Sequence, residues 1–481
     1  MLPPNLDTGR TMPHRNSPGA SAGCLLLCLA ALSACAPPAP APGPGADGRP
    51  NILLLYADDL RFEALGGPGS APVETPHLDR LCARGLNFTR AYASTSRCCP
   101  SRASLLTGLG APRHGIWNNH PQGSFPGELH TIADHLQGAG YNTAWIGKWH
   151  LPNPGAAPIR GFDHWASYEG PGQHFEQAFQ VDGKELRTAG FQADTLVRLA
   201  LAFLDRERAG APFFLSVAFK APHVPLTPSP RRAGSLAAQP VTLPASAGDG
   251  PETLTSFHAR LRTLGRHTLG DRQSYPHSIR AYWELVADVD DAVGALLAAL
   301  TERGLADNTI VIFTSDNGQL LGEHGLFQKG ISYEPAIRLP LVISYPALIP
   351  AGQRSSNLVR EVDLLPTLLE LCDLPPALAT DGLGALDGRS LLPLWTASRG
   401  VRDAFLYLAP HFATGQVVER ALLDDRWKYV RVQAGGQREE HLWDLVDDPD
   451  ERVDRSTDPT CEGILARLSA RMDRELAGLG L

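Results

Sequence analysis

Residues 51–59 read Asn-Ile-Leu-Leu-Leu-Tyr-Ala-Asp-Asp, a nearly continuous apolar run that ends in two carboxylates. Such a run is typical of a parallel strand that is buried on both faces and has polar residues at its carboxyl end. Similar units follow at three later places: 142–146, 213–219 and 309–313. Helical stretches are expected between the strands, at 128–138 and along the amphipathic run 281–303. Strands that alternate with helices predict a layered α/β domain.

Polar side chains follow each of the four predicted strands: Asp58-Asp59, Lys148, Lys220 and Asp316-Asn317. In layered α/β domains, ligands bind beyond the carboxyl ends of the strands. Four separate parts of the sequence are therefore expected to converge on one active site.

The length of 481 residues suits a large domain followed by a smaller one. We place the catalytic domain at residues 51–392, with a surface excursion rich in Pro, Ala, Gly and Ser at 227–276. Short strands and a closing helix predict a smaller α+β domain over 393–481: strands at 404–408 and 427–432, helix at 461–476. The formal net charge of -8 argues against nucleic acid as a partner, although it does not exclude a small anionic substrate.

The N-terminus has the pattern of an export signal. Basic residues precede an apolar run at 24–32 that is too short to span a bilayer. Leu32-Ser33-Ala34-Cys35 resembles a bacterial lipobox, which predicts a lipoprotein signal peptide at 1–35 and a membrane anchor on Cys35. Residues 36–50, nearly all Ala, Pro and Gly, then form an extended tether. We expect an exported protein facing the periplasm or the cell surface, and an ordinary cleaved signal peptide is the alternative.

Residues 98–108 read Cys-Cys-Pro-Ser-Arg-Ala-Ser-Leu-Leu-Thr-Gly. This stretch resembles the signature of the formylglycine-dependent (type I) sulfatases of the alkaline-phosphatase-like superfamily, C-x-P-S-R followed by Leu-Thr-Gly. In that family a dedicated maturation enzyme, which reads the Pro and the Arg, oxidises the first Cys to formylglycine. Cys98 has Pro100 and Arg102 at the required spacing, whereas Cys99 does not. The resemblance also implies the fold, a large mixed sheet between helices with a smaller C-terminal α+β domain.

The chemistry explains why an aldehyde would be needed at residue 98. A hydrated aldehyde carries two hydroxyls, so one can attack sulfur while the other is held in reserve. Deprotonation of the second hydroxyl then expels sulfate and regenerates the aldehyde, which splits one difficult displacement into two easier steps. A serine nucleophile would leave a sulfate ester without such an exit.

Asp58, Asp59, Asp316 and Asn317 offer hard oxygen donors that suit calcium or magnesium and not zinc. Each pair by itself also suits a helix cap or a turn. The resemblance to the sulfatase metal site implies that these four residues and the modified Cys98 bind a divalent cation. We expect Ca²⁺ rather than Mg²⁺.

Four further residues resemble family motifs: Lys148 and His150 in Gly-Lys-Trp-His, His223 in a Pro-His element, and Lys329 as a distal lysine. The resemblance implies that Arg102 and Lys148 orient the hydrated formylglycine and that His150 takes the proton that triggers sulfate release. It implies that His223 and Lys329 hold sulfate and neutralise the leaving oxygen, and that Asp316 assists the attacking hydroxyl. Positive charge and switchable imidazoles are what such a reaction requires.

Other residues receive structural interpretations. We assign packing to Trp145 and Trp149, supporting roles to His114, Glu323 and His324, and a solvated helix face to Asp288, Asp290 and Asp291. The C-terminal motif at 442–451, which resembles a family segment, is also assigned to structure.

The sequence thus predicts a sulfatase that acts on a sulfate monoester of a carbohydrate or an aryl alcohol. The Cys-Cys-Pro-Ser-Arg form resembles that of glucosamine-6-sulfatases and favours a sulfated glycan. Two alternatives stay open: a phosphodiesterase or phosphonate monoester hydrolase of the same superfamily, and an inactive lipoprotein that binds sulfated glycans. An intact maturation motif argues against the inactive binder.

Overall fold

The computed structural model describes residues 48–67, 71–119, 123–153, 156–206, 210–248, 275–375, 384–396, 400–410, 417–434 and 436–481. The predicted signal peptide, nearly all of the tether and much of the excursion at 227–276 lie outside these residues. Within them, ten strands form the main sheet, in the order β14-β2-β13-β9-β1-β8-β4-β5-β6-β7. None of the helices in the described ranges combines the length and apolarity that a membrane span requires.

The bounds of the main-sheet strands are β1 Asn51–Asp58, β2 Leu86–Phe88, β4 Asn142–Gly147, β5 His164–Ser167, β6 Ala178–Val181, β7 Lys184–Arg187, β8 Phe213–Pro222, β9 Thr309–Ser315, β13 Leu341–Ser344 and β14 Gln353–Ser355. The four strands predicted from apolar runs are β1, β4, β8 and β9. They are neighbours in the sheet and pair in parallel, β9 with β1, β1 with β8, and β8 with β4. Antiparallel strands such as β13 and β6 extend the sheet toward both edges, which makes it mixed.

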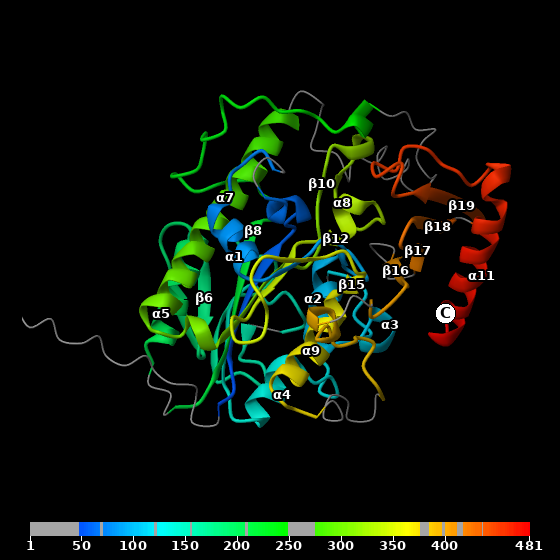
Figure 1. The fold of residues 1–481 in the computed structure, drawn as a ribbon. Helices are drawn as coiled ribbons and strands as arrows, with labels where there is room; N and C mark the ends of the chain where they lie inside the picture. Colours follow the sequence, from blue (N-terminus) through cyan, green and yellow to red (C-terminus); the bar gives the residue numbers. More distant parts are fainter. Residues whose placement is uncertain are drawn as a thin grey trace, which may run out of the picture. The chain divides into compact units, whose positions relative to one another are not determined.

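Apolar side chains of β1 alternate between two cores, as the two-residue period of a strand requires. Leu53 and Leu55 face a cluster that includes α1, α5 and α7, whereas Ile52 and Leu54 face a cluster that includes α2, α4 and α9. Figure 1 shows these helices covering the two faces of the sheet. The main helix bounds are α1 Pro76–Arg84, α2 Cys98–Thr107, α3 Ala111–His114, α4 Ile132–Gly138, α5 Gln192–Leu204, α7 Tyr275–Glu302 and α9 Leu364–Leu371.

The prediction of a solvated acidic face on α7 is wrong for two of its three residues. Asp288 and Asp290 are both 1% exposed. Asp290 accepts hydrogen bonds from the backbone N–H groups of His77 and Leu78 in the first turn of α1, and Asp288 accepts from Ser229. Burial is tolerated because the carboxylates satisfy backbone donors, and at α1 the negative charge lies at the favourable end of the helix.

The C-terminal region forms a separate antiparallel sheet of four strands in the described residues: β16 Ala404–Pro410, β17 Val417–Asp424, β18 Trp427–Ala434 and β19 Gln437–Asp444. One face packs on α11 (Glu462–Gly478) through residues such as Leu422 and Met472. The other face joins a core with Tyr333 and Ile337, which belong to the catalytic region. The predicted fold class, a large mixed sheet between helices with a smaller C-terminal α+β unit, is confirmed.

Candidate active site

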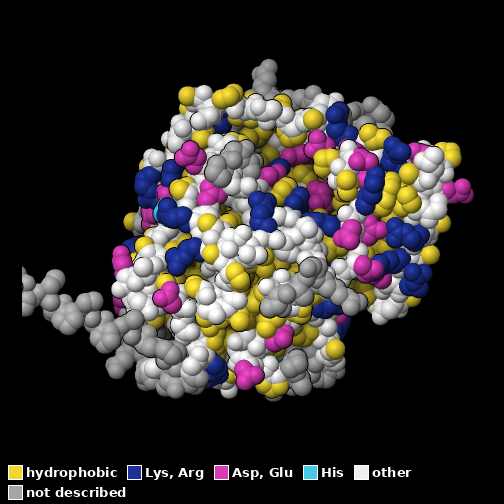
Figure 2. Space-filling model, in the orientation of Figure 1, with side chains coloured by type: hydrophobic (Ala, Val, Ile, Leu, Met, Phe, Trp, Pro, Cys, Tyr) yellow, Lys and Arg dark blue, Asp and Glu magenta, His cyan; other side chains and the backbone are white. Residues whose placement is uncertain are grey.

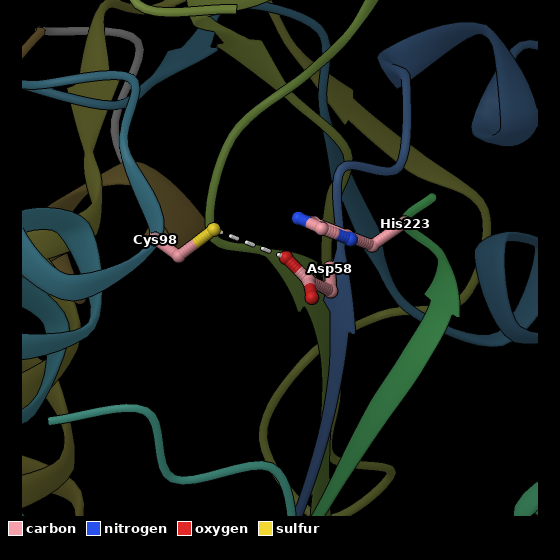
Figure 3. A group of neighbouring side chains, drawn as sticks. All are labelled: Asp58, Cys98 and His223. Atoms are coloured by element: carbon pink, nitrogen blue, oxygen red, sulfur yellow. Dashed lines mark hydrogen bonds between the residues drawn. The ribbon is translucent and has the colours of Figure 1, made fainter. Parts of the chain in front are cut away.

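The carboxyl ends of β9, β1, β8 and β4 bring the predicted polar residues together. Asp58 ends β1 and Asp59 follows it, Asp316 follows β9, and Lys148 follows β4. Cys98 is the first residue of α2, a helix whose ten residues are all buried. Figure 3 shows its side chain pointing toward Asp58, with the His223 ring beside that carboxylate; ligand atoms of the three residues lie within 4.8 Å of one another. On the face drawn in Figure 2, the surface is hollowed near the place where Figure 1 draws β10 (Leu320–Leu321) and β12 (Arg338–Leu339), and acidic and basic side chains gather in the hollow.

Three carboxylates and Cys98 form the centre of the site. Ligand atoms of Asp58, Asp59, Asp316 and Cys98 all lie within 4.8 Å of one another. The Cys98 thiol lies 3.4 Å from Oδ1 of Asp58. Asn317 donates its amide N–H to Oδ1 of Asp59 at 2.7 Å, while its own Oδ1 is buried and has no hydrogen-bond partner in the described part of the chain.

Each carboxylate of this cluster has a cationic partner. Lys148 pairs with Asp58, Lys329 with Asp59, and the Arg102 Nε donates to Asp316 at 2.9 Å. Lys329 also reaches Cys98, with Nζ 3.0 Å from Sγ. The predicted residues therefore meet around one side chain, although they are separated by up to 271 positions in the chain, from Asp58 to Lys329.

Burial and the neighbouring charges shift several pKa values. Burial, with Asp58 next to it, raises the pKa of Asp316 to about 7. Against the burial penalty, Lys148 and His223 hold the pKa of Asp58 well below its usual value. Lys329 keeps its charge because Asp59 and the other neighbouring acids raise its pKa well above the usual value, again against burial. Positively charged side chains with fixed positions therefore lie next to carboxylates whose negative charges repel one another.

The unmodified Cys98 thiol is a poor nucleophile in this environment. Burial, with Asp58 beside it, raises its pKa to about 12, so the thiol stays protonated at neutral pH. Its Sγ occupies the place that an oxygen on Cβ would take after oxidation of the side chain. An unmodified cysteine is therefore not suited to act here as a thiolate.

The two predicted histidines lie at the rim of the cluster. The His223 Nδ1–H donates to the Val224 carbonyl at 2.7 Å, which leaves Nε2 as the atom nearest the acids, 3.9 Å from Asp59. His150 has a buried Nδ1 without a partner in the described residues, and its backbone adopts φ 60°. Burial lowers the pKa of both imidazoles, that of His223 to about 3, so both are neutral near pH 7.

Three further groups support the site. Lys220, which the sequence placed at the end of a predicted strand without a specific role, donates to the Val224 carbonyl at 2.8 Å beside the His223 ring. Tyr282 donates to the Asp59 carbonyl at 2.7 Å from the middle of α7, where nothing distinguishes it from an ordinary core residue. Gly147 precedes Lys148 with φ 113°, and a Cβ there would lie 2.0 Å from the Ala218 carbonyl oxygen. The glycine in the Gly-Lys-Trp-His motif was the one available signal for this close approach.

The residues to which the sequence analysis gave packing or supporting roles contact other protein groups around the site. His114 bonds Ser104 of α2 and the Ile116 N–H. Glu323 pairs with Arg61, just beyond Asp59. Trp145 and Trp149 lie edge to face at 5.1 Å between ring centroids in a buried aromatic cluster.

Comparison with known proteins identifies the family. The family model described as "Sulfatase" matches residues 50–374, and "N-sulphoglucosamine sulphohydrolase, C-terminal" matches residues 322–477. This chain belongs to the sulfatase family. It is 33% identical over 408 residues to N-acetylglucosamine-6-O-sulfatase of Bacteroides thetaiotaomicron, covering 72% of this chain and 71% of that protein.

Solved structures agree with the family assignment. One, described as a complex with its substrate D-glucosamine-2-N,6-O-disulfate, has a TM-score of 0.78 and 27% identity and covers 90% of this sulfatase and 98% of that chain. A phosphonate monoester hydrolase from Silicibacter pomeroyi has a TM-score of 0.73 and 24% identity, with 89% and 95% covered, which shows a shared fold alone. The chain is accordingly a sulfuric ester hydrolase of the alkaline-phosphatase-like superfamily.

The sulfatase family implies a divalent metal, and the donor set fits one. Asp58, Asp59 and Asp316 supply carboxylate oxygens, which suit hard cations. The partnerless Oδ1 of Asn317 is a buried acceptor that a cation would satisfy. Burial, together with the negative charge of Asp58, raises the pKa of Asp316, and a cation would offset both effects.

Proposed function

We propose that this sulfatase hydrolyses a sulfate monoester of a glycan through a formylglycine formed at Cys98 and a bound Ca²⁺. The observation that carries the proposal is the position of Cys98, whose Sγ lies 3.4 Å from Asp58 and 3.0 Å from Lys329. An oxygen nucleophile at this place would have a cation site on one side and a fixed ammonium group on the other. Both groups stabilise the negative charge that develops in sulfuryl transfer.

The proposed Ca²⁺ ligands are Asp58, Asp59, Asp316, Asn317 and the modified residue 98. When bound, the cation would withdraw negative charge from the sulfuryl oxygens. Arg102 is fixed by its bonds to Asp316 and to the Lys148 carbonyl, so it holds residue 98 and the acids in a constant relation.

In the first proposed step, one hydroxyl oxygen of the hydrated residue 98 attacks sulfur and its proton passes to Asp316. The bond between sulfur and the sugar oxygen breaks, and its electron pair stays on that oxygen. Lys329 neutralises this charge, and His223 supplies a proton from Nε2. The His223 ring is neutral before substrate binds, but an anionic sulfate next to Nε2 favours its protonated form.

In the second proposed step, His150 takes the proton of the remaining hydroxyl. The carbonyl of residue 98 re-forms as its bond to the sulfate oxygen breaks, and sulfate leaves. Water then hydrates the aldehyde for another turnover. The lowered pKa of His150 keeps the ring neutral and able to accept this proton.

A sulfated amino sugar is the substrate class that we favour. The relative from Bacteroides thetaiotaomicron is named for N-acetylglucosamine-6-O-sulfate, and the substrate in the solved complex is a glucosamine 2-N,6-O-disulfate. We further propose that a formylglycine-generating maturation enzyme acts on Cys98. We also propose that lipidated Cys35 anchors the protein in a membrane, facing the periplasm or the cell surface, because the sequence at 32–35 resembles a lipobox.

The test is a desulfation assay on protein coexpressed with the maturation enzyme, combined with mass measurement of the peptide that contains residue 98. We expect an aldehyde at residue 98 and release of sulfate from 6-O-sulfated glucosamine. Active protein that carries only an unmodified Cys98 thiol would overturn the proposal. Faster hydrolysis of a phosphonate monoester than of any sulfate ester would favour the alternative hydrolase.

A further inference from the structure

The C-terminal sheet contacts two loops at the site: the one that leads into Cys98 at the start of α2 and the one that follows Lys329. Ser96, two residues before Cys98, accepts a hydrogen bond from the Gly330 N–H at 3.2 Å, and Gly330 directly follows Lys329. Tyr407 of β16 bonds the same Ser96 hydroxyl at 2.7 Å. One hydroxyl of the C-terminal sheet therefore reaches the point where two loops meet: the loop before Cys98, which contains Ser96, and residues 329–334, which we call the lysine loop.

A second contact holds the lysine loop at Ser332. The Ser332 N–H donates to Oε1 of Glu419 on β17 at 2.7 Å, and the Ser332 carbonyl accepts from Nζ of Lys428 on β18 at 2.7 Å. Both main-chain groups of one residue, three positions after Lys329, are thus bound by neighbouring strands. Glu419 and Lys428 are both 0% exposed, so water does not compete for these bonds.

Lys428 also joins a buried ionic network. Its Nζ pairs with Glu334 at 2.9 Å and with Glu451 at 2.7 Å, and Glu451 in turn accepts from the Glu334 N–H. A buried network of this kind adds little stability over an apolar core of the same volume. What it does supply is one defined geometry for the chain segment that it binds.

That geometry matters because Lys329 must bring its ammonium group beside residue 98. A lysine side chain has many rotamers, and only a fixed main chain keeps Nζ within reach of its target. A displacement of about 1 Å can cost about 10²-fold in rate. The loop from Lys329 to Glu334 forms little regular structure before α8 (Glu334–Ile337), so its contacts with other segments fix its position.

We propose that Tyr407, Glu419 and Lys428 of the C-terminal sheet are positioning residues for Lys329. They act through the main chain of residues 330–332 and through Ser96, and they do not touch the reacting atoms. The inference rests on the role of Lys329 in the proposed function. It gives the smaller C-terminal α+β unit a role in positioning Lys329, a role that the sequence did not assign to it.

The test compares single hydrogen-bond changes with a control on the same sheet. Tyr407→Phe removes one hydroxyl, and we expect kcat on a sugar sulfate to fall about fivefold, the rate equivalent of one net hydrogen bond. Glu419→Leu removes the acceptor for Ser332 and is expected to lower kcat by about 10- to 100-fold, whereas Glu419→Gln keeps an acceptor oxygen and should restore most of the rate. KM should change little in each case.

Arg431→Met is the matched control. Arg431 lies on β18 like Lys428, is 6% exposed, and pairs with Asp473 of α11 on the opposite face of the sheet. We expect this change to lower stability without lowering kcat. Thermal unfolding of every variant separates loss of fold from loss of positioning, and Tyr407→Phe remains informative if Glu419→Leu fails to fold.

A double-mutant comparison decides whether the effect passes through Lys329. On a Lys329→Met background, Tyr407→Phe and Glu419→Leu should each lower kcat by less than about twofold more, because the ammonium group that Tyr407 and Glu419 position is absent. Full additivity, or a loss of kcat in Arg431→Met equal to that in Glu419→Leu, would overturn the inference. Failure of Lys329→Met itself to lower the rate would instead contradict the proposed function.

Discussion

Replacement of Lys329 by Met tests the assignment of the leaving-group cation. The substitution keeps most of the side-chain volume and removes a charge that lies 3.0 Å from Sγ of residue 98. A unit charge about 4 Å from a developing oxyanion contributes about 4 kcal/mol at an effective dielectric constant of about 20. Since about 1.4 kcal/mol corresponds to a tenfold change in rate, kcat on a sugar sulfate should fall about 10³-fold.

The same substitution should have a smaller effect on an aryl sulfate. A nitrophenolate spreads its charge over the ring, so roughly half of the electrostatic energy is lost and kcat should fall about 30-fold. The assay measures kcat for glucosamine-6-sulfate and 4-nitrophenyl sulfate. The control is Lys184→Met, the same substitution at an exposed lysine on β7. An equal loss on both substrates would refute the assignment of Lys329 to the leaving oxygen.

Three further outcomes are expected. A chelator should lower both activity and the unfolding temperature, and Ca²⁺ should restore both, because an ion that binds only the folded state stabilises that state; an unchanged unfolding temperature would count against the site. Asn317→Leu should raise the Ca²⁺ concentration needed for half-maximal activity, since the buried Oδ1 disappears, and unaltered Ca²⁺ dependence would remove Asn317 from the ligands. His114 accepts from the Ile116 N–H through Nδ1, and burial lowers its pKa to about 3, so the folded state favours the neutral ring. The contribution of His114 to the free energy of unfolding is therefore complete above pH ~6.5 and falls by about 1.4 kcal/mol per pH unit as the pH is lowered toward 3. Urea unfolding at a series of pH values should show a smaller loss of stability in acid for His114→Gln than for the wild type.

The central strands and the meeting of their polar ends could be predicted because β1, β4, β8 and β9 are buried on both faces. Such strands read as apolar runs that stop at the active-site edge. The edge strands could not be predicted in this way, since β7 is exposed throughout and has no apolar period. Asp288 and Asp290 were misjudged for a related reason: a charged residue is ordinarily exposed, and the backbone donors that bury these two come from segments distant in the sequence.

The roles of Tyr407, Glu419 and Lys428 were beyond the reach of the sequence, because each acts on main-chain groups or a hydroxyl of a loop that no local pattern identifies. The C-terminal motif at 442–451 carried a partial signal. Its Glu451 is 1% exposed and pairs with Lys428, so the motif belongs to the network that holds the lysine loop. A segment can therefore be structural in its contacts and still serve catalysis.

The charges of the site suggest why both a cation and so many acids are needed. Asp58, Asp59 and Asp316 carry three formal negative charges, and Arg102, Lys148 and Lys329 carry three positive charges, so the charges of these six paired side chains sum to zero. A site without net charge offers an anionic ester little attraction in exchange for its hydration. A divalent cation held by the acids would make the sum positive and leave the lysines available to the substrate. Without the cation the carboxylates repel sulfate, but with it they hold the charge that attracts sulfate to the site.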